Sequence, residues 1–85
     1  MPLVTAVTDQ AERMRFWQAW LAARVPVELT ARMTGLTERE DALVVFAESA
    51  AWCARLRFAL KELEGEVREV RPQLATVEVR VLPRG

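Results

Sequence analysis

The sequence contains no histidine, a single cysteine (Cys53) and a single lysine (Lys61) among its 85 residues. Without histidine, the usual Ser-His and Cys-His nucleophile pairs of enzymes cannot be built. A lone cysteine cannot close an internal disulfide, and it cannot supply the several ligands that zinc and other transition metals usually need. We therefore expect a protein that is not an enzyme and carries neither a metal nor another cofactor.

The few groups that could still do chemistry have structural explanations. Cys53 directly follows Trp52 in a helical pattern and is expected to be a small buried hydrophobic residue. Lys61 follows an apolar stripe on a face expected to be exposed, where it lacks the desolvation that activates a Schiff-base amine. The acids of the next segment spread around a helix, as on a solvated surface: Glu62, Glu64, Glu66 and Glu69. We expect no small-molecule substrate.

The net charge is zero, because twelve basic residues balance twelve acidic ones. Dedicated nucleic-acid-binding domains are usually strongly basic. Locally, however, residues 50–61 carry three cations and no acid: Arg55, Arg57 and Lys61. This segment begins at an expected helix N-terminus, which also favours anions. Two interpretations stay open, weak phosphate binding and an ordinary solvated helix face.

Signals for membrane insertion and secretion are missing as well. No apolar stretch approaches the roughly 18 residues that a membrane span needs. The first ten residues lack the basic region and apolar run of a signal peptide. We expect a soluble cytoplasmic protein without a membrane partner, in which residues 1–7 form a loose leader and residues 8–85 a single domain. A hydrophobic content of 52% is enough for a packed core.

The first predicted element is an amphipathic helix over residues 9–24. Asp9 is a good helix N-cap, and Glu12 follows three residues later, as in a capping box. Pro26 should end the helix, leaving room for one more helical turn over 27–31. The apolar residues of the helix recur at spacings of three or four: Met14, Trp17, Leu21 and Val25.

Two extended segments joined by charged residues predict an antiparallel hairpin. The first strand is expected over 32–37, with Gly35 marking a bulge. The second is expected over 42–48, around a run of β-branched and apolar residues. The four charged residues 38–41 should form the turn between them.

A long apolar stripe after the hairpin predicts two consecutive helices. Ser49 offers an N-cap hydroxyl for the first of them. We place the break between Leu60 and Gly65 and expect Glu64 and Arg68 to pair on the exposed side at the i,i+4 spacing. The stripe keeps the helical period throughout: Trp52, Leu56, Leu60, Leu63, Val67 and Val70.

A final strand is expected over 75–82, where Val77, Val79 and Val81 alternate with polar residues, so that only one face is buried. The predicted order is α-β-β-α-α-β. An α+β fold with a three-stranded sheet and helices on one face accommodates it.

Trp52 has two roles open to it. An exposed tryptophan could anchor a bound partner, since tryptophan is enriched at such positions. The stripe that continues from Trp52 favours a core role instead, in which truncation to alanine would cost about 3–5 kcal/mol.

The segment ALVVFAESAAWCARLRF, residues 42–58, combines an LVV-type strand, a small polar turn and a capped helix that carries a tryptophan. It resembles the signature of the DciA-like family of bacterial replicative-helicase loaders, long catalogued as a domain of unknown function. PVELTARMTGL before it and VEVRV after it resemble the flanking segments of that family. The resemblance covers most of the chain, and the matching positions are Ser49, Ala50, Ala51, Trp52, Leu56 and Arg57.

The resemblance implies a K-homology-like domain that assists a DnaB-type replicative helicase onto or along single-stranded DNA. The weak DNA contact would then come from Arg55, Arg57 and Lys61. The sequence departs from the family in its zero net charge and in lacking the basic extension that many members carry. The glycine-bracketed loop of nucleic-acid-binding K-homology domains is also absent. Contact with protein is therefore expected to matter more than contact with DNA.

Two other functions fit the same residues. One is a nucleic-acid-binding K-homology-like module without a helicase partner. The other is a protein-interaction or homo-oligomer module whose sheet edge pairs with another chain. Salt-dependent affinity for DNA would distinguish the nucleic-acid-binding module from the protein-interaction module. Co-purification with a DnaB-type helicase would distinguish the helicase-binding function from both of these alternatives.

Overall fold

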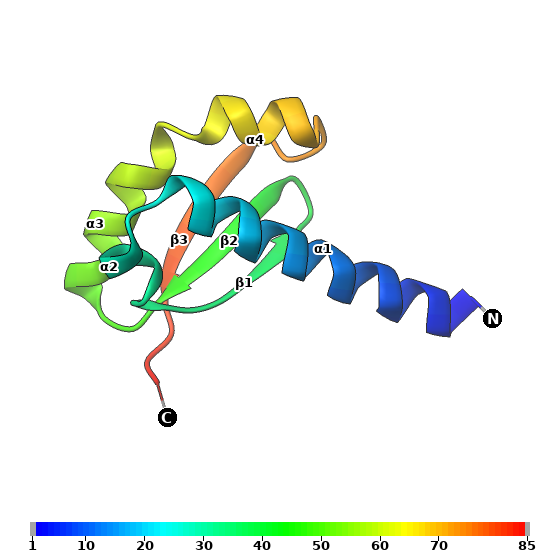
Figure 1. Cartoon of the computed structure of the whole chain (residues 1–85), viewed down its shortest axis with the longest axis horizontal. Helices are drawn as coiled ribbons and strands as arrows, with labels where there is room; N and C mark the ends of the chain where they lie inside the picture. Colours follow the sequence, from blue (N-terminus) through cyan, green and yellow to red (C-terminus); the bar gives the residue numbers. More distant parts are fainter. Residues whose placement is uncertain (1, 85) are drawn as a thin grey trace.

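A computed structural model describes residues 2–84 of the chain, with side chains from residue 10 onward. These residues form four helices and three strands in the order shown in Figure 1. Apart from α2, which is a single turn, this is the predicted α-β-β-α-α-β order of an α+β fold, and the structure confirms it. The bounds are α1 Pro2–Arg24, α2 Val27–Thr30, β1 Met33–Arg39, β2 Ala42–Ala47, α3 Ala50–Lys61, α4 Glu64–Val70 and β3 Thr76–Val81.

Helix α1 begins at Pro2, well before the predicted start at Asp9. The leader expected over 1–7 is therefore wrong from Pro2 onward, while Met1 lies outside the described residues. The predicted cap at Asp9 is also wrong, because this position is inside the helix. Proline is tolerated at the first position of a helix, and no further proline or glycine occurs before Pro26. The helix ends before Pro26, as predicted, and its N-terminal part extends away from the sheet in Figure 1.

The sheet is mixed, with the order β1-β2-β3. Strands β1 and β2 form the predicted antiparallel hairpin, and β3 pairs with β2 in parallel. The predicted bulge is confirmed, because the register of β1 shifts between Met33 and Gly35. The turn is shorter than the predicted 38–41, since β1 runs to Arg39. Glu40 has a φ of 53°, the left-handed conformation that a two-residue hairpin turn requires at its first position.

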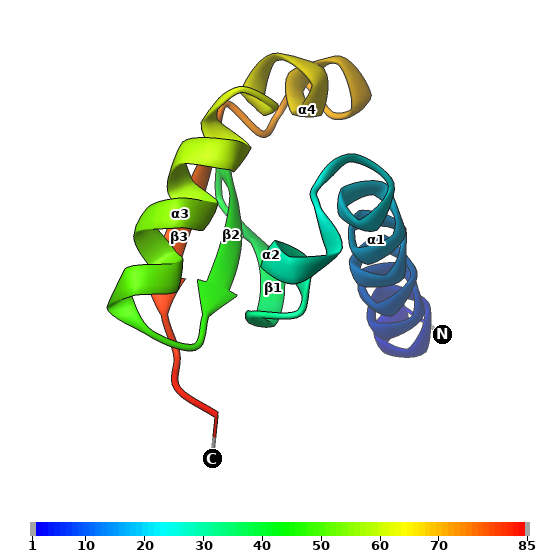
Figure 2. The ribbon, with the colours of Figure 1, turned by 60° about the vertical axis from the view of Figure 1, so that its left-hand side comes forward.

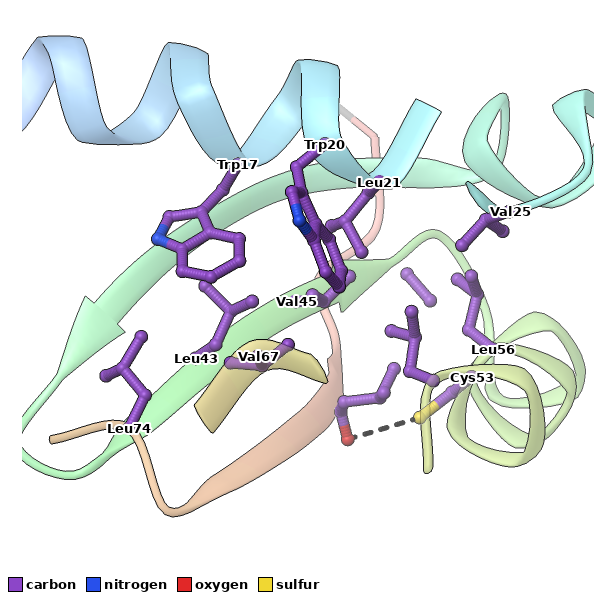
Figure 3. Packing of buried hydrophobic residues seen from close by; sticks show 13 residues of the cluster. Trp17, Trp20, Leu21, Val25, Leu43, Val45, Cys53, Leu56, Val67 and Leu74 are labelled. Carbon is purple, nitrogen blue, oxygen red and sulfur yellow. Dashed lines mark hydrogen bonds between the residues drawn. The ribbon is translucent and has the colours of Figure 1, made fainter. Parts of the chain in front are cut away.

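The core lies between the sheet and helices α1 and α3. Alternate residues of β2, among them Leu43 and Val45, are fully buried and belong to one cluster with Trp17 and Leu21 of α1 and Leu56 of α3 (Figure 3). Because alternate residues of a strand point to one face, both helices cover the same face of the sheet, as predicted. Figure 2 shows α1 and α3 on either side of α2.

A carboxylate joins α1 to the hairpin and to the segment before β3. The indole Nε1 of Trp17 donates to Glu38 Oε2 at 2.7 Å. The Nε atoms of Arg13 and Arg71 lie 3.3 and 3.4 Å from the same carboxylate. The Glu38 side chain is only 12% exposed. Glu38 thus neutralises two cations and holds the tryptophan that fills the centre of the core.

The second helical segment breaks between Lys61 and Glu64, inside the predicted interval. The predicted Glu64–Arg68 ion pair does not occur among the described side chains, because both residues reach toward the last strand. Glu64 Oε2 accepts from the backbone N–H of Val77 at 2.9 Å, and Arg68 Nη1 donates to the carbonyl of Ala75 at 2.9 Å. Backbone groups at the start of β3 compete for side chains that the helix alone would have paired.

The predicted apolar face of β3 is only partly buried. Val79 is buried and Val77 packs against the core, whereas Val81 is 45% exposed. The sequence alternation thus gives the correct face for this strand and overestimates the length over which it is covered.

Candidate partner-binding surface

The three cations of α3 lie on two sides of the helix. The guanidinium of Arg55 is 5.3 Å from the centre of the Trp52 ring. Arg57 lies about 200° further around the helix, where its Nη2 is 3.5 Å from the carbonyl oxygen of Val79 in β3. Lys61 follows Arg57 by one turn on that side. The structure therefore does not bring the expected phosphate-binding residues Arg55, Arg57 and Lys61 into one cluster.

Phe58 projects from α3 between these two groups of cations and is 76% exposed. Its position two residues after the buried Leu56 places it about 200° away from the core-facing side of the helix. Sequence reasoning missed this residue as a site residue. The helical period of the sequence predicts its exposure, because an aromatic ring so far around the helix from the apolar stripe cannot enter the core.

A groove beside Phe58 separates α3 from α2. Its volume is about 540 Å³, within the roughly 300–1,000 Å³ typical of binding clefts. Val27 of α2, whose neighbours on both sides line the groove, is 77% exposed. We call this feature the α2–α3 groove, and its lining residues are Pro26, Glu28, Leu29, Ala54, Arg55, Phe58 and Ala59.

Trp52 stands at the start of α3 between the core and the surface. Ser49 caps the helix as predicted, since its Oγ accepts from the backbone N–H of Trp52 at 3.3 Å. The Trp52 ring is half-buried against the core, and the guanidiniums of Arg32 and Arg55 lie 4.8 and 5.3 Å from its centre. Leu56 is fully buried. The core role predicted for Trp52 is therefore correct for one part of the ring only.

Glu48 organises the charges behind Trp52. Its two carboxylate oxygens accept from Arg32 and Arg84, each at 2.9 Å. Hydrogen bonds from Arg84 and then Arg32 lower the pKa of Glu48 below its ordinary value of 4.5. Arg32 is thus held by an acid, whereas Arg55 and Lys61 form no ion pair with any side chain of residues 10–84.

Cys53 is buried and is a free thiol. Its Sγ donates to the carbonyl oxygen of Val79 at 3.4 Å (Figure 3). The predicted role of a small buried hydrophobic residue fits this position. Over the part of the chain that the structure describes, no three or more acidic, cysteine or histidine side chains gather as a metal site would require. The exposed groups of this surface are thus apolar side chains and the cations Arg55 and Lys61.

The outer edge of β3 is occupied by side chains from the helices. Glu64 accepts from the N–H of Val77, and both Cys53 and Arg57 donate to the carbonyl of Val79. These contacts satisfy backbone groups that a further strand would otherwise use. The edge-pairing alternative is therefore disfavoured at β3.

Along the other edge strand, β1, side chains contact backbone carbonyls near both ends, because Arg84 Nη2 lies 3.5 Å from Met33 O and Thr37 Oγ1 donates to Glu38 O at 3.4 Å. Within residues 10–84, no side chain forms a hydrogen bond with the backbone of Thr34 or Leu36. A groove of about 290 Å³ runs beside this strand and includes Gln18 and Leu21 of α1 in its lining. Both edge strands thus keep some backbone groups that form no hydrogen bond with a side chain of residues 10–84, among them those of Thr34 and Leu36 in β1.

No family model matches the chain, and none of the curated proteins is similar to it. Over the described range, α1 is the longest helix, and no helix combines the length and apolar composition that crossing a membrane requires.

Proposed function

We propose that this chain is a non-enzymatic accessory module of DNA replication that resembles DciA, binds a DnaB-type replicative helicase in the cytoplasm, and makes weak contact with single-stranded DNA. The observation that carries the binding role is the exposed surface of α3, where Phe58 is 76% exposed beside the apolar α2–α3 groove. The helicase as partner comes from the resemblance of residues 42–58.

An exposed aromatic ring next to an apolar groove is typical of protein-interaction surfaces. Two of the most exposed large hydrophobic residues of the described chain, Val27 and Phe58, belong to α2 and α3. Exposed apolar area of this kind has no stabilising role in the isolated domain, whereas a bound partner would remove it from water.

The DNA contact is expected to be weak because the cations of α3 are divided. Arg57 is engaged with β3, which leaves Arg55 and Lys61 as the freer pair on opposite sides of Phe58. Two phosphate contacts to a single strand would give a log–log salt slope of about −1.4, using roughly −0.7 per contact. Both the zero net charge and this geometry support affinities in the micromolar range or weaker.

The test is calorimetric titration of the purified chain into the DnaB-type helicase of the same cell, together with a titration of a single-stranded oligonucleotide at two salt concentrations. We expect a saturable complex with the helicase and weak, salt-sensitive DNA binding. Absence of the helicase complex would contradict the proposal. Strong salt-dependent DNA binding without the helicase complex would instead support the nucleic-acid-binding module.

A further inference from the structure

We propose that the α2–α3 groove binds an amphipathic helix of the partner protein, whose apolar side chains contact Phe58 and whose acidic side chains lie beside Arg55. The inference rests on the proposed function in taking the helicase as that partner. It adds the binding face on this chain and the chemistry of the segment that this face recognises.

The shape of the groove favours a helix over an extended strand. Its longer wall, α3, is a helix whose backbone groups are largely hydrogen-bonded internally, so an extended peptide would find few backbone partners along it. Ala54 and Ala59 line the groove on the α3 side. Such small side chains let a second helix axis approach closely, at the roughly 8–10 Å usual for packed helices.

The two charged residues of the groove, Arg55 on α3 and Glu28 on α2, would orient a bound helix. Between Ala50 and Lys61, α3 carries three cations and no acid. Arg55 lines the groove and, within residues 10–84, forms no ion pair. Glu28 lines the opposite side, on α2. A bound helix with acids on one flank and a cation on the other would match both sides and would have a defined orientation.

The lining favours a protein over a nucleic acid. Apart from Glu28 and Arg55, the residues that line the groove are apolar: Pro26, Leu29, Ala54, Phe58 and Ala59. A phosphate backbone would meet a single cation there and would also face the carboxylate of Glu28. An apolar stripe of a helix, in contrast, would cover Phe58, which solvent now reaches over about three quarters of its surface.

The first test measures the affinity of the full chain for the helicase after Phe58→Ser and after Arg55→Glu. Because Phe58 is 76% exposed, Phe58→Ser should leave the fold intact, which circular dichroism and thermal melting check. Each change should weaken binding by about tenfold or more, as for hot-spot residues. The matched controls on α1, Phe16→Ser and Arg15→Glu, should change it less than about twofold.

The second test places the photo-crosslinker p-benzoylphenylalanine at position 58, with position 16 as the control. Mass spectrometry of the helicase complex should find position 58 linked to a helical segment that combines apolar and acidic residues. A crosslink to an extended or basic segment, to DNA or to a second copy of the chain would overturn the inference. Unchanged affinity of the Phe58→Ser variant would overturn it alone, whereas failure of the unsubstituted chain to bind the helicase would overturn the proposed function as well.

Discussion

Trp17 and Trp52 occupy opposite parts of the same core and show how differently this small domain uses one residue type. Trp17 is fully buried over the middle of the sheet, and its N–H donates to Glu38. Trp52 lies in the first turn of α3 and is half-buried, with guanidiniums on its ring. Both residues sit on helical apolar stripes, so the stripe alone does not determine burial.

Each tryptophan also depends on a glutamate, in a different way. Glu38 binds the indole of Trp17 directly. Glu48 contacts Trp52 only indirectly. It accepts a hydrogen bond from Arg32, and the guanidinium of Arg32 lies over the Trp52 ring. The first arrangement fixes a buried ring, and the second positions a charge on a ring that solvent still reaches.

The largest expected effect is that of Trp17→Ala. Truncating a fully buried tryptophan typically costs about 3–5 kcal/mol, and it would also leave the Glu38 carboxylate without its indole donor. A domain of this size has roughly 4–13 kcal/mol of stability, at about 0.05–0.15 kcal/mol per residue. We expect a large drop in the urea midpoint. Phe58→Ala, which shortens an exposed ring, is the control and should leave the midpoint nearly unchanged.

Trp52→Ala should have an intermediate effect of about 1–2 kcal/mol, because only part of the ring is buried. This is smaller than the 3–5 kcal/mol expected for a full core role. The same urea titration measures it, and the variant should remain folded at 25 °C. If Trp52→Ala and Trp17→Ala lose equal stability, the distinction between the two tryptophans is wrong.

The smallest effect concerns Glu48 and acid pH. The pKa of Glu48 is lowered in the folded protein by Arg84 and Arg32. The stabilisation is therefore fully present above the unfolded pKa of about 4.5 and is lost as pH falls through the lower folded pKa. Thermal melting between pH 7 and pH 3 should show a shallower loss of stability for Glu48→Gln than for the unsubstituted chain. If stability falls equally steeply with pH in both proteins, the two arginines do not lower the pKa of Glu48 in the folded protein.

Much of the fold could be predicted because its signals are local. The apolar run of β2, the Ser49 cap of α3 and the break before Glu64 each depend on a few neighbouring residues, and all three occur as expected. The start of α1 is less predictable, because Asp9 has the chemistry of a helix cap while no helix-breaking residue lies between Pro2 and Pro26.

The candidate surface was less predictable, because it depends on where helices lie relative to one another. The cations of α3 are close in sequence, yet the turn of the helix separates Arg55 from Arg57. Leu29 and Phe58 are twenty-nine positions apart in the sequence, and only the packing of α2 against α3 makes them line one groove. The i,i+4 rule could not anticipate that Glu64 would bind the backbone of β3.

The capping of β3 has a consequence for self-association. A sheet with two open edges can add strands at both and grow without limit, which is the route to fibres. Here Glu64, Cys53 and Arg57 hydrogen-bond two backbone groups of β3. The backbone of Thr34 and Leu36 in β1 forms no hydrogen bond with a side chain of residues 10–84. Two copies that joined through β1 would form a symmetric pair in which both remaining edges are β3. Addition of a further strand at β3 would first have to break the contacts at Val77 and Val79.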